Sequence, residues 1–474
     1  MEPIKVEEIL VWTRGKLEHG NRSGVIRSIC TDTRTLSAGD FFIPLSGQNF
    51  DGHNFIPAAA RKGASGSLFS PKNFSPTTIT KHLPSGGGDF ILIEVPDTRQ
   101  SLLTIAGNYR KRFRIPVIAI TGSSGKTTTK DLIAKILSGS LPPHALSGGS
   151  YVLANAGSFN NEIGLPLSLL NLNRSHRFAV LELGMNHPGE IDLLSRTARP
   201  TCGLITNIGS AHLGFFPNRK DLAAAKAELL THLKNGLAVL PADDHFLPFF
   251  SSFPVKKKVT FGLRQTADYF PEKIVISQKG ISFWLCGKGK RPLPLSVPLF
   301  GLFNLKNVLA ACALTLELGI EKEVLSEQIS SFKTPDHRFQ ITQKNGIFFV
   351  DDTYNANPAS FREALADFYR LTDRNRKIVV AGSMAELGRF SRASHLALGH
   401  FLAKLNPNLL LLMGPEKKTV RAGAIRAGLA DSRIRVAKDS PAAARILKKR
   451  LRAGDSVFLK GSRFLKMEEI LDTL

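Results

Sequence analysis

The chain has 474 residues, 43% of them hydrophobic and 22% charged, which is typical of globular proteins with sizeable cores and favours about three domains. No apolar run approaches the roughly 18 residues of a membrane-spanning helix, and the first residues lack the basic-then-apolar layout of a secretory signal. The four cysteines are far apart and form no CxxC pair, which favours reduced thiols over a disulfide framework or a zinc site. We therefore expect a cytoplasmic protein with no membrane partner.

The formal net charge of +24 raises the question of nucleic-acid binding. However, the 63 lysines and arginines are scattered, with only short runs such as Lys256–Lys258 and Lys448–Arg450, and no basic motif is interleaved with aromatic residues. A basic proteome background, or attraction for polyanionic nucleotides, accounts for the charge equally well. We therefore expect no nucleic-acid partner.

Residues 1–98 are predicted to form a small N-terminal α/β domain. Phe41–Leu45 has the composition of a short buried strand, and residues 56–62 carry a helical pattern that ends at Gly63. Several polar residues surround this strand, namely Asp32, Arg34, Asp40 and Asp51. They are either turn and capping residues or the contacts of a polar ligand, and the residues alone leave both interpretations open.

Residues 99–332 are predicted to form a central domain with a parallel sheet and a phosphate-binding loop. An apolar run ending at Ile120 leads into Gly122-Ser-Ser-Gly-Lys-Thr127, and a helical pattern follows. Backbone N–H groups at a helix start are unpaired, and the helix dipole adds positive charge there, so this layout binds phosphate. The full Walker motif has a further glycine where this chain has Ile120, so the loop is a short form. The pattern predicts a nucleotide site, with Lys126 on the β/γ-phosphates and Thr127 toward Mg²⁺.

Four further residues of the central domain are candidates that also have a plainer interpretation. Glu182 lies near the C-terminal end of the apolar strand 179–184, where ligand sites of open α/β sheets lie, so it either reaches a metal or caps the turn. A lone histidine such as His212 is more often structural than a ligand. Lys226, on an alanine-rich helix, is of a type normally solvated, and Asn304 stands where a helix N-cap would stand.

Residues 333–474 alternate strand and helix patterns, which predicts a second parallel, Rossmann-like sheet. The expected strands are Ile347–Val350, Lys377–Ala381, Leu409–Met413 and Val457–Lys460. Polar loops follow the first two strands, over Asp351–Pro358 and Ala381–Gly388. Both loops follow the carboxyl ends of strands, which is where ligand sites of such sheets lie.

Taken together, the motifs of the chain resemble the Mur ligases of peptidoglycan synthesis. The matching segments are Gly122–Thr127, Asn160–Pro166, Glu182–Gly184, Ala211-His212, Ala225–Glu228, Asn304–Asn307 and Asp351–Pro358. Thr31–Arg34, Gly39-Asp40, Asp51–His53, Tyr354–Pro358 and Met384–Gly388 are most similar to the ligases that add D-alanyl-D-alanine to UDP-N-acetylmuramoyl-tripeptide. The Asp-Asn-Pro-Arg signature usual in the diaminopimelate- or lysine-adding ligases is absent.

The resemblance implies an ATP-dependent amide-forming ligase with three domains: a UDP-substrate domain, a central ATPase domain and a C-terminal Rossmann-like domain. ATP would convert the C-terminal carboxylate of the nucleotide-linked peptide into an acyl phosphate, which the amine of D-Ala-D-Ala would attack. Cations and phosphate-cradling amides are therefore expected to dominate the site. We expect a monomer whose partners are these two substrates, in cytoplasmic peptidoglycan precursor synthesis.

The resemblance also implies roles for individual residues. Nucleotide contacts would come from Gly122, Ser123, Ser124, Gly125, Lys126, Thr127 and Thr128, with Asn304 and Asn307 at adenine, Arg338 at the transferring phosphate and Asp352 at ribose. Two Mg²⁺ ions would be held, one by Thr127 and Glu182 and one by Glu182, His212 and Lys226. Because an ammonium would repel that second ion, the family carries this lysine carbamylated by CO₂. The catalytic set would be Lys126, Glu182, His212, Lys226 and Arg338. The substrate set would be Asp32, Thr33, Arg34, Ser46 and Asp51 for the UDP-sugar, Asn160 and Asn161 on the acceptor path, and Tyr354, Asn355 and Asn357 on the dipeptide side.

Two positions depart from the family pattern. Phe303 stands where a histidine is usual before Asn304, and Ser383 replaces the usual aspartate before Met384. Another Mur ligase or a folylpolyglutamate synthase would share the phosphate loop and the acyl-phosphate chemistry, and the amine accepted separates them. In a different class, a P-loop ATPase that binds nucleic acid would hydrolyse ATP without any UDP-peptide.

Overall fold

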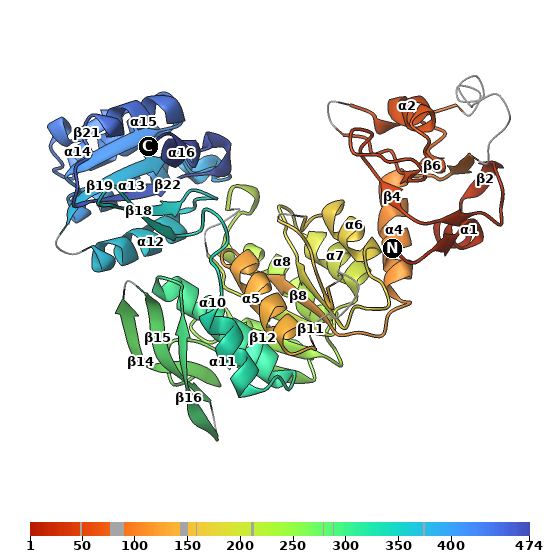
Figure 1. The fold of residues 1–474 in the computed structure, drawn as a ribbon, viewed down its shortest axis with the longest axis horizontal. Coiled ribbons are helices and arrows are strands. Elements are labelled where there is room, and N and C mark those ends of the chain that lie inside the picture. The colour runs from red at the N-terminus through yellow and green to blue at the C-terminus, as the bar shows by residue number, and fades with distance from the viewer. Residues whose placement is uncertain are drawn as a thin grey trace.

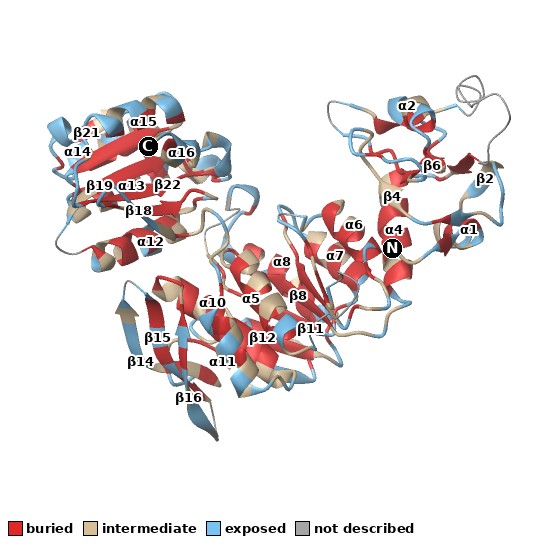
Figure 2. Ribbon diagram, viewed as in Figure 1, coloured by how far each residue is buried: buried red, intermediate tan, exposed pale blue. Residues whose placement is uncertain are grey.

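The computed structural model describes residues 1–47, 50–75, 90–142, 150–157, 159–209, 213–277, 279–287, 289–372 and 375–474. Three sheet-based units follow one another along the chain, with the N-terminal and C-terminal sheets at opposite ends of a central one (Figure 1). Buried residues concentrate on the strands and on the helix faces that cover them (Figure 2). In the part of the chain that the structure describes, every helix is too short or too polar to cross a bilayer.

The N-terminal unit contains a five-stranded sheet in the order β2-β7-β6-β5-β4. The strands are β2 Lys16–His19, β4 Ile29–Cys30, β5 Phe41–Phe42, β6 Gly66–Phe69 and β7 Ile91–Glu94, and β2 alone is antiparallel to its neighbour. Helices α1 Val6–Thr13 and α2 Ile56–Arg61 and a small pair, β1 Ile4–Lys5 with β3 Val25–Ile26, complete the unit. The strand expected over Phe41–Leu45 is shorter than predicted. Its last residues are still buried, but Pro44 has no N–H to donate to a ladder.

The central unit is built on a nine-stranded sheet in the order β16-β15-β14-β13-β12-β11-β8-β10-β9. The parallel strands are β8 Val117–Thr121, β9 Val152–Ala154, β10 Phe178–Glu182, β11 Cys202–Ile205, β12 Leu237–Pro241 and β13 Lys257–Phe261. Beyond them, β14 Tyr269–Ser277, β15 Gly280–Gly287 and β16 Lys290–Val297 form an antiparallel extension that we did not predict. The parallel part confirms the expected architecture and places β8 between β10 and β11.

Helices cover both faces of this central sheet. They are α4 Thr98–Arg110, α5 Lys126–Gly139, α6 Gly164–Leu170, α7 Glu190–Ala198, α8 Arg219–Thr231, α9 Leu247–Ser251, α10 Leu302–Glu317 and α11 Lys322–Ser330. One core packs α4, α6, α7 and α8 against the sheet, and a second packs α5, α10 and α11 on the other face. Helix α5, after β8, packs on one face of the sheet, and helix α7, after the neighbouring strand β10, packs on the other, so a crevice forms at the carboxyl ends of these two strands.

The C-terminal unit has a six-stranded sheet in the order β17-β18-β22-β19-β20-β21. Its strands are β17 Gln340–Lys344, β18 Ile347–Asp352, β19 Arg376–Gly382, β20 Leu409–Met413, β21 Ile434–Val436 and β22 Asp455–Lys460. Its helices are α12 Pro358–Leu371, α13 Ser391–Leu405, α14 Lys417–Arg426, α15 Ser440–Lys448 and α16 Glu469–Thr473. All four predicted strands are present. The edge strands β17, which is antiparallel, and β21 were not predicted, because both are short and half exposed.

Candidate active site

The phosphate loop joins β8 to the start of α5, as the glycine pattern predicts. Gly122 has φ 144° and Gly125, the N-cap of α5, has φ 83°. A Cβ on Gly122 would lie 1.9 Å from Thr206 Oγ1, and one on Gly125 would lie 2.1 Å from Asn307 Oδ1. Both positions therefore require glycine, for conformation and for space. The loop backbone therefore packs closely against Thr206 and Asn307.

Asn207, which the sequence did not single out, fixes the shape of this loop. Its backbone carbonyl accepts from Ser123 N at 3.0 Å, and its side chain accepts from Ser124 N at 3.2 Å and donates to Ser124 O at 3.0 Å. Thr206 Oγ1 donates to the same carbonyl of Ser124 at 2.6 Å. Asn207 follows β11, the neighbour of β8, so the strand order alone indicates that it would reach the loop.

Lys126 folds back across the loop and donates from Nζ to Gly122 O at 2.9 Å. Burial lowers the pKa of Lys126, and the charge of Arg338 lowers it further, while Glu182 and Glu386 act in the opposite direction. The amino group of Lys126 therefore lies at the phosphate loop. An anion bound there would restore the stability of its charged form.

Glu182 ends β10 and is 4% exposed. Its carboxylate accepts from Thr127 Oγ1 at 2.7 Å and from Asn160 Nδ2 at 2.8 Å. Asn155, which we did not predict, positions the residue by accepting from Glu182 N at 2.9 Å. Arg338, from the C-terminal unit, donates to Thr127 Oγ1 at 3.0 Å. These contacts bring three of the predicted site residues together around one hydroxyl.

The oxygen atoms of Thr127 and Glu182 are the donor type that Mg²⁺ prefers. Among the described residues there is no group of three or more His, Cys, Asp and Glu side chains that could enclose a metal. Mg²⁺ commonly binds through one or two protein oxygens together with substrate phosphates and water. The residues present therefore fit a magnesium ion shared with a nucleotide.

Lys226 lies on α8 and is 1% exposed, so the alternative of a solvated lysine is wrong. Burial lowers the pKa of Lys226 well below its usual range. The charge of Lys126 adds to this lowering, and that of Glu182 opposes it. A helix of this composition is expected to expose its lysine, but α8 packs between α7 and the sheet. His212, the other predicted ligand of the second metal, lies outside the described residues.

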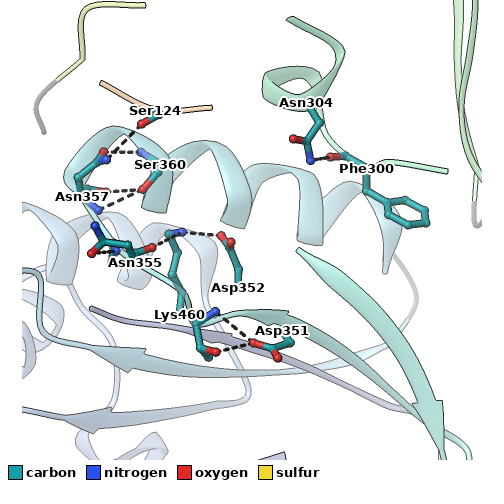
Figure 3. Close-up of polar contacts among 11 residues, drawn as sticks. Ser124, Phe300, Asn304, Asp351, Asp352, Asn355, Asn357, Ser360 and Lys460 are labelled. Atoms are coloured by element: carbon teal, nitrogen blue, oxygen red, sulfur yellow. Dashed lines mark hydrogen bonds and ion pairs between the residues drawn. The ribbon is translucent and has the colours of Figure 1, made fainter. Parts of the chain in front are cut away.

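Asn304 and Asn307 lie on the first turns of α10, both buried. The N-cap of α10 is Gly301 and not Asn304, so the capping interpretation of Asn304 is wrong. Asn304 Nδ2 donates to Phe300 O at 2.9 Å (Figure 3), and Asn307 Nδ2 donates to Asn304 Oδ1 at 3.3 Å. Asn307 thereby faces the phosphate loop next to Gly125.

Phe303, one of the two departures from the family pattern, borders the cleft and meets Phe339 in a T-shaped contact with 5.9 Å between ring centroids. Ser383, the other departure, accepts a hydrogen bond from Glu416 N at 2.9 Å through its hydroxyl group. It is buried directly after strand β19. The first replaces a polar group by aromatic packing between the central and C-terminal units. The second has a structural task in this chain.

Asp352 and Lys460 form a buried ion pair at the ends of the neighbouring strands β18 and β22 (Figure 3). Lys460 Nζ lies 2.5 Å from Asp352 Oδ2 and donates to Asn355 O at 3.1 Å. Burial raises the pKa of Asp352, and the charge of Lys460 opposes this. Sequence reasoning missed Lys460, for which the only signal is its position at a strand end.

The loop after β18 reaches across to the phosphate loop. Asn357 caps α12 by accepting from Ser360 N at 2.9 Å, and its Nδ2 donates to Ser124 Oγ at 3.2 Å (Figure 3). Tyr354 stacks beneath the guanidinium of Arg338, whose carbon lies 3.9 Å from the ring centroid. The C-terminal unit is thus in direct contact with the groups that the central unit presents.

These residues line one cleft of about 820 Å³ between the central and C-terminal units. From the predicted set it contains Ser123, Ser124, Gly125, Lys126, Thr127, Thr128, Asn160, Asn161, Glu182, Asn304, Asn307, Arg338, Asp352, Tyr354, Asn355 and Asn357. Gly122 lies at the base of the loop, and Lys226 is buried and does not line the cleft. Asn161 also has a structural role, because its side chain accepts from Ile163 N and Gly164 N at the start of α6.

The N-terminal candidates do not line this cleft. Asp51 accepts from Ser46 Oγ at 2.9 Å, from Asn73 Nδ2 at 2.6 Å and from His53. Although burial acts to raise it, these hydrogen bonds lower the pKa of Asp51. The unit is nevertheless connected to the cleft, because Arg99 donates to Ser46 O at 2.6 Å and pairs with Glu162 on the cleft wall.

Asp32, Thr33 and Arg34 form a separate exposed turn. Arg34 bonds the Asp32 carboxylate through its backbone and its guanidinium, which lowers the pKa of Asp32 to about 2. The backbone carbonyl of Thr33 accepts from Lys62 Nζ at 2.6 Å. In this structure the turn and capping interpretation accounts for these contacts, and the arginine keeps free donors for a ligand.

Comparison with known families matches all three units. Residues 25–110 match the Mur ligase family catalytic domain, residues 120–315 the Mur ligase middle domain, and residues 337–463 the Mur ligase glutamate ligase domain. The UDP-N-acetylmuramoyl-tripeptide–D-alanyl-D-alanine ligase of Bacillus subtilis is 32% identical over 95% of this chain and 93% of its own length. The ligase of the same name from Synechocystis is 34% identical over 95% and 92%.

Solved structures agree with these matches. The chain superposes on MurF from Acinetobacter baumannii with a TM-score of 0.86 at 30% identity, covering 100% of this chain and 98% of the other. It superposes on MurF ligase from Thermotoga maritima in complex with ADP with a TM-score of 0.78 at 27% identity, covering 94% and 97%. The chain therefore belongs to the Mur ligase family, within its group of UDP-N-acetylmuramoyl-tripeptide–D-alanyl-D-alanine ligases.

Proposed function

We propose that this enzyme uses ATP to join D-alanyl-D-alanine to UDP-N-acetylmuramoyl-tripeptide, forming an amide bond in peptidoglycan precursor synthesis. The observation that carries the proposal is the single cleft in which the phosphate loop, Glu182 and Arg338 converge. Near-full-length similarity to ligases of this name supports the choice of substrates.

The cleft suits the activation of a carboxylate. A carboxylate acylates poorly because oxide would have to leave, whereas transfer of the γ-phosphoryl group of ATP to one of its oxygens creates a phosphate leaving group. The amine then attacks the carbonyl carbon, the C–O bond to phosphate breaks, and the nitrogen loses a proton. The amide, ADP and inorganic phosphate are the products.

Each stage brings negative charge into one place, and the chain supplies groups to balance it. Lys126 and the backbone amides of the phosphate loop would hold the β- and γ-phosphates. Arg338, fixed by Thr127 and by the ring of Tyr354, would bind the phosphoryl group during its transfer. Asn304 and Asn307 would contact adenine, and Asp352 the ribose. Positioning and charge balance together account for this class of catalysis.

Thr127 and Glu182 would hold the magnesium ion shared with ATP, which when bound would neutralise phosphate charge. A second ion would be held by Glu182, His212 and Lys226. We propose that Lys226 is N-carboxylated for this purpose. Burial lowers its pKa, so a larger share of the amine is neutral and able to attack CO₂, and the product is an oxygen ligand.

The first unit would bind the UDP-sugar through Asp32, Thr33, Arg34, Ser46 and Asp51. Arg99 and Glu162 join this unit to the wall that carries Asn160 and Asn161, which supports a path for the peptide from one unit to the other. Substrates such as ATP and a UDP-linked peptide support a cytoplasmic location.

The test is phosphate release with ATP, Mg²⁺ and UDP-N-acetylmuramoyl-tripeptide, with D-Ala-D-Ala, D-Glu, L-Ala or diaminopimelate added separately. We expect turnover with D-Ala-D-Ala alone and a pentapeptide product by mass. Turnover with a different amine would assign the enzyme to a different amide-forming step within the same family. Phosphate release that does not depend on the UDP-linked peptide and that rises with added nucleic acid would overturn the proposal.

A further inference from the structure

Lys130, on α5, is a buried cation to which the reaction described above gives no role. The residue is 3% exposed. Its Nζ donates to Asn155 O at 2.6 Å and lies 3.1 Å from Asp131 Oδ1. Taking an ammonium out of water costs several kcal/mol unless hydrogen bonds and an opposite charge compensate for the lost hydration. These two contacts supply that compensation, so the position of the ammonium is tied to that of Asn155.

Asn155 extends this contact to the backbone of Glu182. It directly follows β9, which ends at Ala154, opposite Val180 of β10. Its side-chain amide then continues the pairing that β9 no longer provides, because Oδ1 accepts from Glu182 N at 2.9 Å and Nδ2 donates to Glu182 O at 3.1 Å. Nδ2 also donates to Phe159 O at 2.8 Å. A primary amide has two N–H donors, so both donors of Asn155 are in use.

Helix α5 therefore holds Glu182 at two points. Thr127 and Lys130 are three residues apart on α5, which makes them neighbours on the helix surface. Thr127 Oγ1 donates to the carboxylate of Glu182 at 2.7 Å, whereas Lys130 reaches the backbone of the same residue through Asn155. A carboxylate held only by its oxygen atoms would still move with its backbone. The second connection fixes that backbone relative to the helix that carries Thr127.

We propose that Lys130 is a positioning residue for Glu182, that it acts through Asn155, and that it thereby raises the affinity of the nucleotide site for Mg²⁺. This inference rests on the proposed function, in which Thr127 and Glu182 hold that ion. Lys130 does not line the cleft between the central and C-terminal units, so it acts on the site only through its neighbours. Replacing residues that orient metal ligands typically lowers metal affinity by roughly 10- to 100-fold.

The experiment measures binding of a non-hydrolysable ATP analogue by calorimetry over a series of Mg²⁺ concentrations. Lys130→Met removes the charge and the donors but keeps a long side chain. We expect the Mg²⁺ concentration that gives half of the full effect to rise about tenfold, and the affinity for the analogue without Mg²⁺ to stay nearly unchanged. Lys135→Met is the matched control. Lys135 lies on the same helix and donates from Nζ to a backbone carbonyl, that of Ser331, at 2.9 Å, outside the cleft.

A double-mutant cycle tests whether Lys130 acts through Asn155. Asn155→Ala should raise the Mg²⁺ requirement at least as much as Lys130→Met does. Combining the two substitutions should then change it little further, because residues that act through one contact are not additive. A thermal melt checks the folding of each variant, and Asn155→Ala tests the same connection from its other end if Lys130→Met does not fold.

Several results would overturn the inference. They are a Mg²⁺ requirement unchanged in Lys130→Met or in Asn155→Ala, an equal rise in Lys135→Met, fully additive effects of the two substitutions, and a wild type whose affinity for the analogue does not depend on Mg²⁺. These measurements need neither the UDP-linked peptide nor the amine. They therefore decide the role of Lys130 separately from the ligation assay, whose failure would refute only the proposed substrates.

Discussion

The hydroxyl of Thr127 donates a 2.7 Å hydrogen bond to the carboxylate of Glu182, although the two residues are 55 positions apart. The parallel pairing of β8 and β10 brings them together, because Glu182 is in register with Ile120, two residues before the phosphate loop begins. Thr127 then lies in the first turn of the helix that follows the loop. The pair therefore lies at the carboxyl ends of two adjacent, buried strands, which favours a fixed geometry for metal and phosphate.

Replacing Glu182 by glutamine should lower turnover at least 100-fold. The substitution keeps the shape but removes the negative charge that would hold Mg²⁺, and one of the two hydrogen bonds from Thr127 and Asn160 loses its acceptor. Phosphate release measures the effect, and a thermal melt checks folding. Glu228→Gln is the control, because Glu228 also accepts two hydrogen bonds, from Gly189 N and Asp192 N, but lies outside the cleft. Equal losses in both variants would contradict the role of Glu182.

Gly125→Ala should abolish nucleotide binding, and Gly189→Ala should not. The two glycines have φ values of 83° and 87°, so alanine carries a similar backbone strain of about 1–2 kcal/mol at each. Only at Gly125 would the new Cβ meet another group, 2.1 Å from Asn307 Oδ1, whereas nothing lies within 4 Å at Gly189. Binding of a fluorescent ATP analogue distinguishes the cases. Tight binding of the analogue by Gly125→Ala would contradict this prediction, because it would show that the loop or Asn307 can move to make room for the new Cβ.

Lys226→Met should abolish ligation while raising stability near pH 7 in CO₂-free buffer. The folded-state pKa of Lys226 is lowered, so between that value and the usual 10.5 the unfolded chain binds more protons than the folded one. Wild-type stability therefore rises with pH across this window, and the advantage of methionine should shrink as pH approaches 10.5. Urea unfolding at several pH values measures it. A variant no more stable than wild type at any pH would argue against a penalty from this amine.

Carbamylation makes a separate prediction for the same residue. Removal of dissolved CO₂ should lower wild-type turnover, and added bicarbonate should restore it. ATP binding by Lys226→Ala should remain close to wild type, because the side chain is buried and does not line the cleft. Intact-protein mass under mild conditions and turnover in degassed buffer are the two measurements. Turnover that is independent of CO₂ would leave the lysine with another role.

Asp352→Asn should destabilise the protein by about 3 kcal/mol, since it leaves the buried Lys460 charge without its partner. The double substitution Asp352→Asn with Lys460→Met should recover much of that loss, because both charges are then absent. If Asp352 also binds ribose, the KM for ATP should stay raised in both variants. Denaturant unfolding and ATP kinetics separate the two effects. Recovery of the ATP KM together with stability would leave Asp352 a structural role only.

Local patterns in the sequence were sufficient for the fold class, for part of each sheet and for the centre of the site. The phosphate loop, the strand that ends at Glu182 and four strands of the C-terminal sheet follow from apolar periodicity and glycine placement, which are short-range properties. The strands β9, β12 and β13 of the central sheet, its antiparallel strands β14–β16, the edge strands β17 and β21, and all strands of the N-terminal unit except β5 were not predicted. Half-exposed strands carry mixed polarity, so their pattern is weak.

What only the tertiary structure decided is which polar residues meet and which are buried. Nothing in the segment around Lys226 indicates that its helix packs against a sheet and encloses the amine, because burial depends on neighbours distant in the chain. In the same way, Asn207 and Lys460 reach the site because the strand order brings them there. The sequence by itself determined the chemistry available and the elements that carry it. The packing of those elements determined the distances and the dielectric environment on which that chemistry depends.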